Sequence, residues 1–201
     1  MAEVYAYDTW VPVIDPQAWV HPTAVLIGDV LIGPGCYVGP GAVLRGDFGR
    51  IQLKRGANFQ DNCMAHSFPG ALVLVEEDGH VGHGAILHGC RVGRNAMIGM
   101  NSVVMDRAVV GENAIVGAMS FVKAGMEVPP NSLVLGSPAR VVRQLSADEM
   151  TWKAAGTRHY HKLAAEAPDK IRRSEPLSVI EAERPQLGDV GYRPLMDMDR
   201  S

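Results

Sequence analysis

Three histidines are spaced so that they could share one metal ion. His66 and His88 are 22 residues apart, and His83 lies five positions before His88. If one coil of the chain takes about 18 residues, His66 and His88 can stack on adjacent coils once the extra residues between them are looped out. His83 would then point to a different side, where it could meet the pair of a neighbouring subunit. Three neutral imidazoles with an open fourth position form a hydrolytic or hydrating zinc site.

The remaining candidate ligands fit a metal site less well. His21 stands alone and is typical of a surface histidine. His159 and His161 lie in a predicted helix at a two-residue spacing, which places them on different faces. An odd number of cysteines without a CxxC pair argues against a disulfide framework and favours buried, inert thiols. The cysteines are Cys36, Cys63 and Cys90.

An aliphatic side chain at every sixth position is the strongest fold signal. The longest run is Val92, Ile98, Val104, Val110, Val116, Val122, Val128 and Val134. A helix would place apolar side chains at three- and four-residue steps and a simple strand at every second residue, so neither period fits. The pattern predicts an all-β solenoid, in which short strands joined by tight turns direct the aliphatic side chains inward and small residues fill the corners.

The same six-residue repeat of aliphatic side chains, called the beat below, starts near the N-terminus and is interrupted three times. Its first members are Val20, Leu26, Ile32, Val38 and Leu44, with corner residues Ala24, Val30, Cys36, Ala42 and Phe48. The phase is lost at 49–52, which predicts a bulge or a short loop. Within 67–80, Pro69 and Gly70 signal a turn and Leu72–Val75 could form a strand; we expect the whole segment to project from the coil as a loop. The third slip, between Leu87 and Val92, falls where His88 would need to be re-aimed.

These patterns divide the chain into four segments. They are an extended leader (1–18), the solenoid (19–140) with its loop (67–80), a C-terminal helix (141–167) and an extended or flexible tail (168–201). Ser146 followed by Glu149 has the spacing of a capping box, which should open the helix at Ala147. Such a helix would cover the outside of this coil or of a neighbouring one.

Composition excludes several classes of function. The chain has 201 residues and a net charge of −3, so it offers no basic surface for nucleic acid. Its N-terminal residues lack a basic region followed by an apolar one, and no stretch of eighteen apolar residues could span a membrane. We therefore expect a cytoplasmic protein that acts on a small molecule, with neither nucleic acid nor a membrane as a partner.

Several short motifs resemble one known family. They are RGD at 45–47, NFQD at 58–61, the isolated His66, VGHGAILHGC at 81–90 and IGM at 98–100. Together they resemble the gamma-class carbonic anhydrases, a family of hexapeptide-repeat proteins, over roughly 19–140. The resemblance implies a left-handed parallel β-helix that forms a homotrimer, an exception to right-handed crossovers. It also implies that His66 and His88 of one subunit and His83 of the next bind Zn²⁺, or another divalent metal such as Co, Ni or Fe.

The resemblance also implies roles for five other residues. Gln60 would hydrogen-bond the metal-bound water, and Asp61 resembles an acid just outside the ligands that could relay protons. Arg45 and Asp47 resemble a pair that bridges subunits beside the metal; a purely structural interface ion pair is the alternative. Asn58 resembles a polar residue of the pocket.

A closer resemblance extends into the predicted helix. The stretches HPTAVLIGDV at 21–30, EDGHVGHGAILHGC at 77–90, LGSPAR at 135–140 and LSADEMTWKAAGT at 145–157 resemble the phenylacetate-degradation branch of the family, and its near relatives from carnitine operons. This resemblance implies an acyl-CoA thioesterase in which a metal-bound hydroxide attacks the thioester carbonyl. The sequence does not indicate which residues would hold the CoA moiety.

Three other functions stay open. One is CO2 hydration at the same metal, although no acidic residue that could export protons follows His66 before Glu76. Another is acyl transfer without metal, with a histidine as the base. The last is a non-catalytic scaffold or activator of a pathway enzyme.

Overall fold

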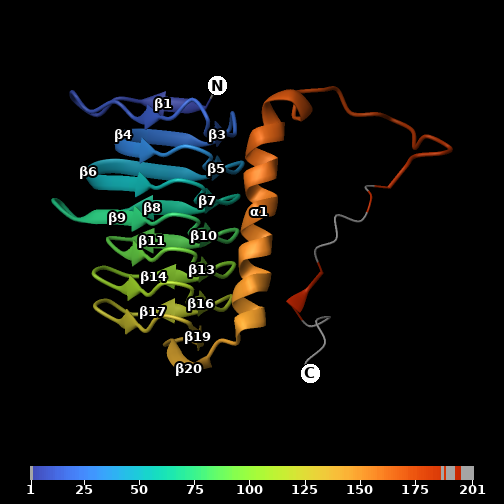
Figure 1. Ribbon diagram of the computed structural model, residues 1–201. Coiled ribbons are helices and arrows are strands. Elements are labelled where there is room, and N and C mark those ends of the chain that lie inside the picture. The colour runs from blue at the N-terminus through green and yellow to red at the C-terminus, as the bar shows by residue number, and fades with distance from the viewer. Residues whose placement is uncertain (1, 187, 189–192, 196–201) are drawn as a thin grey trace.

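The chain winds into a stack of parallel coils with one long helix beside it (Figure 1). A computed structural model describes residues 2–186, 188 and 193–195. Each coil contributes to each of three faces, and on each face the strands of successive coils pair in parallel. The predicted parallel β-solenoid with a C-terminal helix is confirmed.

The first and second faces are continuous because two long strands cross the corner between them. These strands are β4 (Val25–Ile32) and β6 (Val43–Leu53). The first face continues through β8 (Met64–His66), β11 (Ile86–His88), β14 (Val103–Val104) and β17 (Phe121–Val122). The second face continues through β9 (Leu72–Val75), β12 (Arg91–Val92), β15 (Val109–Val110) and β18 (Glu127–Val128).

The third face holds seven parallel strands and one antiparallel strand. The parallel strands are β3 (Trp19–Val20), β5 (Tyr37–Val38), β7 (Asn58–Phe59), β10 (His80–Val81), β13 (Met97–Ile98), β16 (Ile115–Val116) and β19 (Ser132–Leu135). The antiparallel strand is β20 (Arg140–Gln144), which pairs with β19 and closes the end of this face.

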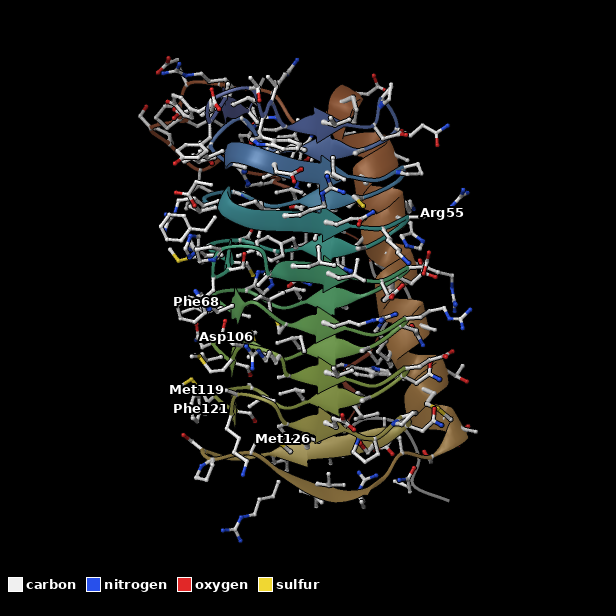
Figure 2. All side chains as sticks on the ribbon, turned by 90° about the vertical axis from the view of Figure 1, so that its left-hand side faces the viewer. Arg55, Phe68, Asp106, Met119, Phe121 and Met126 are labelled. Carbon is white, nitrogen blue, oxygen red and sulfur yellow. The ribbon has the colours of Figure 1, made fainter. Side chains whose placement is uncertain are left out.

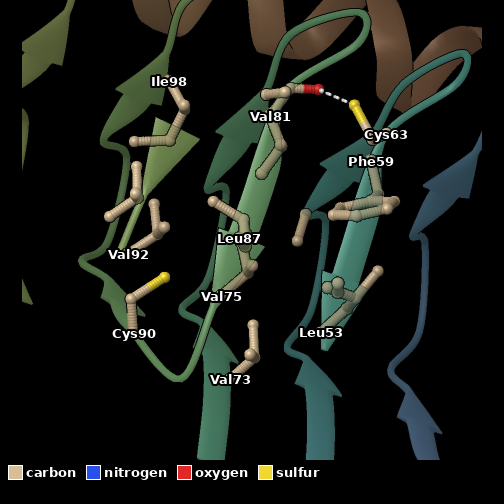
Figure 3. Close-up of a cluster of buried hydrophobic side chains, with 14 of the residues drawn as sticks. Leu53, Phe59, Cys63, Val73, Val75, Val81, Leu87, Cys90, Val92 and Ile98 are labelled. Atoms are coloured by element: carbon tan, nitrogen blue, oxygen red, sulfur yellow. Dashed lines mark hydrogen bonds between the residues drawn. The ribbon is translucent and has the colours of Figure 1, made fainter. Parts of the chain in front are cut away.

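The six-residue beat marks the interior of the coil, as predicted. Every beat residue from Leu26 to Leu44, and from Val92 to Val134, is at most 3% exposed. Figure 3 shows side chains of this kind from successive coils packed against one another. The three cysteines are buried and free, and burial raises the pKa of each thiol to about 12. These thiols are therefore core residues, as the sequence indicated.

Asparagines turn the chain at the corner between the second and third faces. Asn95, Asn113 and Asn131 have φ angles of 53°, 58° and 56°, in the left-handed region that asparagine tolerates. Their side chains form a ladder: Asn95 Nδ2 donates to Asn113 Oδ1 at 2.8 Å, and Asn113 Nδ2 donates to Asn131 Oδ1 at 2.9 Å. The ladder repeats because each coil places its turn directly below the previous one.

The N-terminal boundaries differ from the predicted segments. The segment 1–18, expected as an extended leader, carries β1 (Glu3–Tyr5) and β2 (Val13–Ile14), which pair in parallel with β4. They satisfy the backbone groups that the edge of β4 would otherwise leave unpaired. Phe48, expected at a corner of the core, is 50% exposed because β6 runs through that corner without a turn.

The loop expected over 67–80 is shorter in the structure. Leu72–Val75 return to the sheet as β9, between β6 and β12, so only 67–71 leave the coil between β8 and β9. Val73 and Val75 point into the core and are fully buried. An apolar segment of four residues is long enough to fill one face, so the possible strand at 72–75 forms, but it belongs to the sheet and not to a projecting loop.

The C-terminal helix α1 (Ala147–Lys170) begins where the capping box predicted. Ser146 accepts a hydrogen bond from the backbone N–H of Glu149, whose side chain accepts one from the backbone of Ser146. The helix does not start at 141, because β20 occupies that segment, and it ends three residues past the expected 167. The predicted tail (168–201) lies partly outside the described residues. No helix in the described part of the chain is long and apolar enough to cross a membrane.

Helix α1 lies against the third face and runs back along the whole stack (Figure 1). Lys153 fixes it: Nζ donates to the backbone oxygen of Asp78 at 2.7 Å and to Oδ1 of Asn95 at 2.8 Å. Nε2 of His161 donates to the backbone oxygen of Gly56 at 2.9 Å. Only 2% of Lys153 is exposed, and this burial lowers its pKa to about 7.

Stability should therefore depend on pH through Lys153. Between pH 7 and 8.5 the unfolded chain keeps the Lys153 proton that the folded chain releases, so the free energy of unfolding should rise by about 1 kcal/mol per pH unit. Above that range the buried thiols act in the opposite direction, because the unfolded chain loses their protons first. Urea unfolding at fixed protein concentration measures the rise. The Lys153→Met variant should not show it, and parallel curves for the two proteins would contradict the prediction.

Candidate functional site

His66 and His88 lie side by side where the first face meets the second. They end strands β8 and β11, which pair in register so that His88 stands directly opposite His66. Nδ1 of His66 is 3.3 Å from Nε2 of His88, and the two rings are 5.3 Å apart. The extra residues between them form the 67–71 loop, after which β9 rejoins the second face. The predicted stacking of these two histidines is thus present in the structure.

Each of these histidines has a carboxylate on its outer nitrogen. Nε2 of His66 lies 3.0 Å from Oδ1 of Asp47, and Nδ1 of His88 lies 2.7 Å from Oδ1 of Asp106. Arg45 donates to the other oxygen of Asp47 at 2.6 Å. These contacts fix both ring orientations, and the inner nitrogens face each other as a result.

Aromatic side chains flank the pair. The ring of Phe48 lies 5.3 Å from that of His66, and the ring of Phe68 lies 5.2 Å from that of His88 in an edge-on arrangement. Figure 2 shows Phe68 and Asp106 on the same side of the coil as Met119 and Phe121. The histidine pair therefore sits on a partly apolar surface, with side-chain exposures of 14% for His66 and 25% for His88.

His83 lies at a different corner, between the third and first faces. Its side chain is 46% exposed, and Nδ1 lies 2.7 Å from Oδ2 of Asp61, which occupies the same corner one coil earlier. In the described part of the chain, no group of three or more histidine, cysteine or acidic side chains converges as a metal site would require. One copy of the chain brings together two of the three predicted ligands and leaves the third apart, on the side that the spacing indicated.

Asn58, Gln60 and His80 form a hydrogen-bonded row beneath helix α1. Nε2 of Gln60 donates to Oδ1 of Asn58 at 2.8 Å and to Nε2 of His80 at 2.7 Å. His80 therefore accepts through Nε2 and carries its proton on Nδ1, a buried atom without a hydrogen-bond partner among the described residues. Burial lowers the pKa of His80 to about 3, so the ring stays neutral and orients the amide of Gln60.

A cavity of about 500 Å³ separates helix α1 from the third face near this row. Its apolar walls are formed by Met97 from β13 and by Trp152, Tyr160 and Leu163 from the helix. The ring of Tyr160 also packs edge-on against the ring of His80 at 5.2 Å. The helix thus forms one wall of an apolar chamber whose other wall is the coil.

The mouth of this cavity reaches the corner that carries His83. Gly82, His83 and Met100 line it there, while Gln60, His80 and Lys153 supply its polar groups. The predicted residues Gln60 and His83 therefore border one cavity, and Asp61 contacts His83. Arg45 and Asp47 lie instead at the His66 and His88 corner.

Sequence reasoning missed Asp106 and His80. Asp106 follows His88 by 18 residues, the length of one coil, so the repeat itself could have identified it as the side chain below His88. His80 stands beside Asn58 and Met97, which lie 22 residues before it and 17 residues after it, so an 18-residue offset would not have identified it. The cavity had no comparable signal, because it depends on where the helix docks.

A family model and a similar protein point to the same family. Residues 12–46 and 89–124 match the family described as Bacterial transferase hexapeptide (six repeats). The carnitine operon protein CaiE of Citrobacter koseri is 52% identical over 183 residues, which cover 91% of this chain and 93% of that protein. The resemblance to carnitine-operon proteins is confirmed, whereas those to gamma-class anhydrases and to the phenylacetate branch stay predictions.

Two crystal structures are similar over most of their length. A Bacillus cereus protein provisionally named an acetyltransferase has a TM-score of 0.80 and 34% identity, covering 82% of this chain and 95% of that one. A hexapeptide transferase family protein from Anaplasma phagocytophilum has a TM-score of 0.78 and 34% identity, covering 81% and 96%.

The neutral state of His80 can be measured directly. The imidazole signals that disappear from the NMR spectrum of the His80→Asn variant should not move between pH 5 and 8 in the folded wild type. The same signals should titrate near pH 6.5 when the protein is unfolded in urea. A sigmoidal shift near pH 6.5 in the folded protein would show that His80 does not stay a neutral acceptor for Gln60.

Proposed function

We propose that this chain, which belongs to the hexapeptide-repeat family that includes the carnitine operon protein CaiE, is a metal-dependent hydrolase of acyl-CoA thioesters. The observation that carries the proposal is the pair formed by His66 and His88, whose inner nitrogens face each other at 3.3 Å. The sequence resemblance to the phenylacetate branch makes phenylacetyl-type thioesters the first substrates to assay.

The chemistry of the pair fits a divalent cation. When Asp47 and Asp106 are ionised, they accept the N–H protons of the outer nitrogens, so both inner nitrogens present lone pairs. Two facing lone pairs repel each other unless a proton or a cation lies between them. Two nitrogen ligands of a tetrahedral zinc ion, each at about 2.0–2.1 Å, are about 3.3 Å apart, which matches the observed distance.

A third ligand would come from a second copy of the chain. His83 is exposed at the opposite edge of the first face, and its contact with Asp61 leaves Nε2 to bind. The first face and its adjoining corner carry apolar side chains that are each more than a third exposed: Met64, Ile86, Met100, Met119 and Phe121. A homotrimer in which these surfaces meet would bring His83 of one copy to His66 and His88 of the next.

The bound ion would supply Lewis-acid chemistry, polarising a carbonyl and making water acidic. Asp47 and Asp106 hold the rings of His66 and His88 in the ligating orientation. Burial alone would raise the pKa of Asp47, but the hydrogen bonds with Arg45 and His66 and the charge of Arg45 together outweigh it and lower this pKa. Arg45 thereby helps to keep Asp47 ionised. Gln60, oriented by Asn58 and His80, presents its amide oxygen away from both of them.

Asp61 would take a proton at the edge of this site. Its carboxylate contacts Nδ1 of His83 and is 37% exposed, so it connects the site with solvent. The first acid after His66, by contrast, is Glu76, which is 7% exposed and pairs with Lys54 at 2.6 Å and with Arg91. A carboxylate held in this way is a poor proton shuttle, which argues against fast CO2 hydration.

Acyl transfer is the second candidate. The contact between His83 and Asp61 resembles a histidine base oriented by a carboxylate, an arrangement that needs no metal. The description of the matched family and the provisional name of the Bacillus cereus protein both favour a transferase. The two candidates differ in whether the reaction requires a divalent ion and in what accepts the acyl group.

The test combines metal content, mass in solution and thioester hydrolysis. The protein should be a trimer with about one divalent ion per chain. Because a catalytic ion contributes several kcal/mol, the His66→Ala, His88→Ala and His83→Ala variants should each lower kcat/KM at least about 100-fold and lose the ion. His21→Ala is the control and should change neither.

Two results would contradict the proposal. One is full thioester hydrolysis by protein stripped of divalent ions. The other is fast acyl transfer to an amine or alcohol, with slow hydrolysis, that depends on His83 and not on His66 or His88; this result would favour the second candidate.

A further inference from the structure

We infer that the cavity between helix α1 and the third face binds the acyl group of the thioester, and that this acyl group is bulky and largely apolar. The inference rests on the proposed function, because it names the substrate class of that same site. Its basis is the position, size and lining of the cavity.

The position of the cavity places it next to the reacting group. Its mouth is lined by His83, the side chain that would join His66 and His88 of a neighbouring copy, and by Gly82 and Met100 from the same corner. A thioester carbonyl held at this corner would direct its acyl side inward, beneath the helix. The CoA side would then extend along the outer surface of the coil.

The size of the cavity indicates how large the acyl group is. A volume of about 500 Å³ lies in the range of small-molecule sites, roughly 300–1,000 Å³. One water molecule takes a share of only about 30 Å³ in the liquid. A triatomic substrate such as CO2 would leave most of this chamber without a function, whereas a ring-bearing acyl group would fill a large part of it.

The walls indicate that the group is apolar and flat. Met97, Trp152, Tyr160 and Leu163 present methylene, thioether and aromatic surface to the cavity. Thioether and aromatic side chains adapt to, and stack on, planar rings. An acyl group without such surface would not gain from leaving water for this chamber.

Polar side chains form only a small part of the lining. Gln60, His80 and His83 come from the coil, and Lys153 and His159 come from the helix. Gln60 and Lys153 are each only 2% exposed, and both already hold hydrogen bonds within the protein. We therefore expect the preferred acyl group to carry few polar atoms besides its thioester carbonyl.

A second cleft helps to locate the acyl site. It lies at the other edge of the helix and is lined by Pro34, Arg55, Asp78, His161 and Pro168, among others. That cleft is more polar, and its lining includes none of the residues predicted to react. The apolar cavity is thus the one that combines an apolar lining with His83.

Filling the cavity from the helix tests the inference. The Leu163→Trp variant should reduce kcat/KM for phenylacetyl-CoA about 30-fold more than kcat/KM for acetyl-CoA, mainly through KM, because the added ring occupies the space of the larger acyl group. The wild type should prefer phenylacetyl-CoA over acetyl-CoA by at least about tenfold. Arg158→Trp places the same ring on the exposed side of the helix and should leave both values unchanged.

A binding measurement separates this inference from the proposed function. Calorimetry with phenylacetyl-CoA and the His66→Ala variant needs no turnover; adding Leu163→Trp should weaken binding about tenfold or more, and adding Arg158→Trp should not. If wild-type protein hydrolyses no thioester but this difference is found, the proposed function fails and the acyl site stands. If hydrolysis occurs but Leu163→Trp alters neither the substrate preference nor the binding, the acyl site is wrong.

Discussion

The register between successive coils is the constraint on which the rest of this structure depends. Backbone hydrogen bonds hold each strand directly below its predecessor, so a side chain can be placed only in columns along the stack. The same register builds the buried aliphatic columns, the asparagine ladder and the pair formed by His66 and His88. The candidate functional residues stand in the columns that carry polar side chains instead of small or aliphatic ones.

The sequence predicted what this register repeats and failed where the register is locally broken. The beat from Val92 to Val134 identified the interior, because a six-residue period fits no other regular structure. The stacking of His66 on His88 followed from coil length alone. Leu72–Val75 could be read as a strand, but its place in the sheet was missed because a face needs only a short apolar strand. Phe48 was misjudged because β6 crosses its corner without turning. The cavity could not be predicted, since it depends on how the helix docks on the coil, and no sequence repeat relates the two.

The triangular coil also explains why no single copy completes the predicted metal site. His66 and His88 stand at one end of the first face and His83 at the other, so the width of a face separates them. The apolar side chains on that face would be covered if copies met there. In such an assembly, the groups that polarise the substrate and the chamber that receives its acyl group would belong to different copies.

Helix α1 changes how the stack can come apart. A solenoid whose coils touch only their neighbours can open one coil at a time, since its energy is a sum of local terms. Here helix α1 starts after the last coil and runs back to the first, and Lys153 and His161 hydrogen-bond it to coils in between (Figure 1). Opening any of these coils must also break the contacts of the helix. The repeated modules are thereby converted into one cooperative unit that unfolds as a whole.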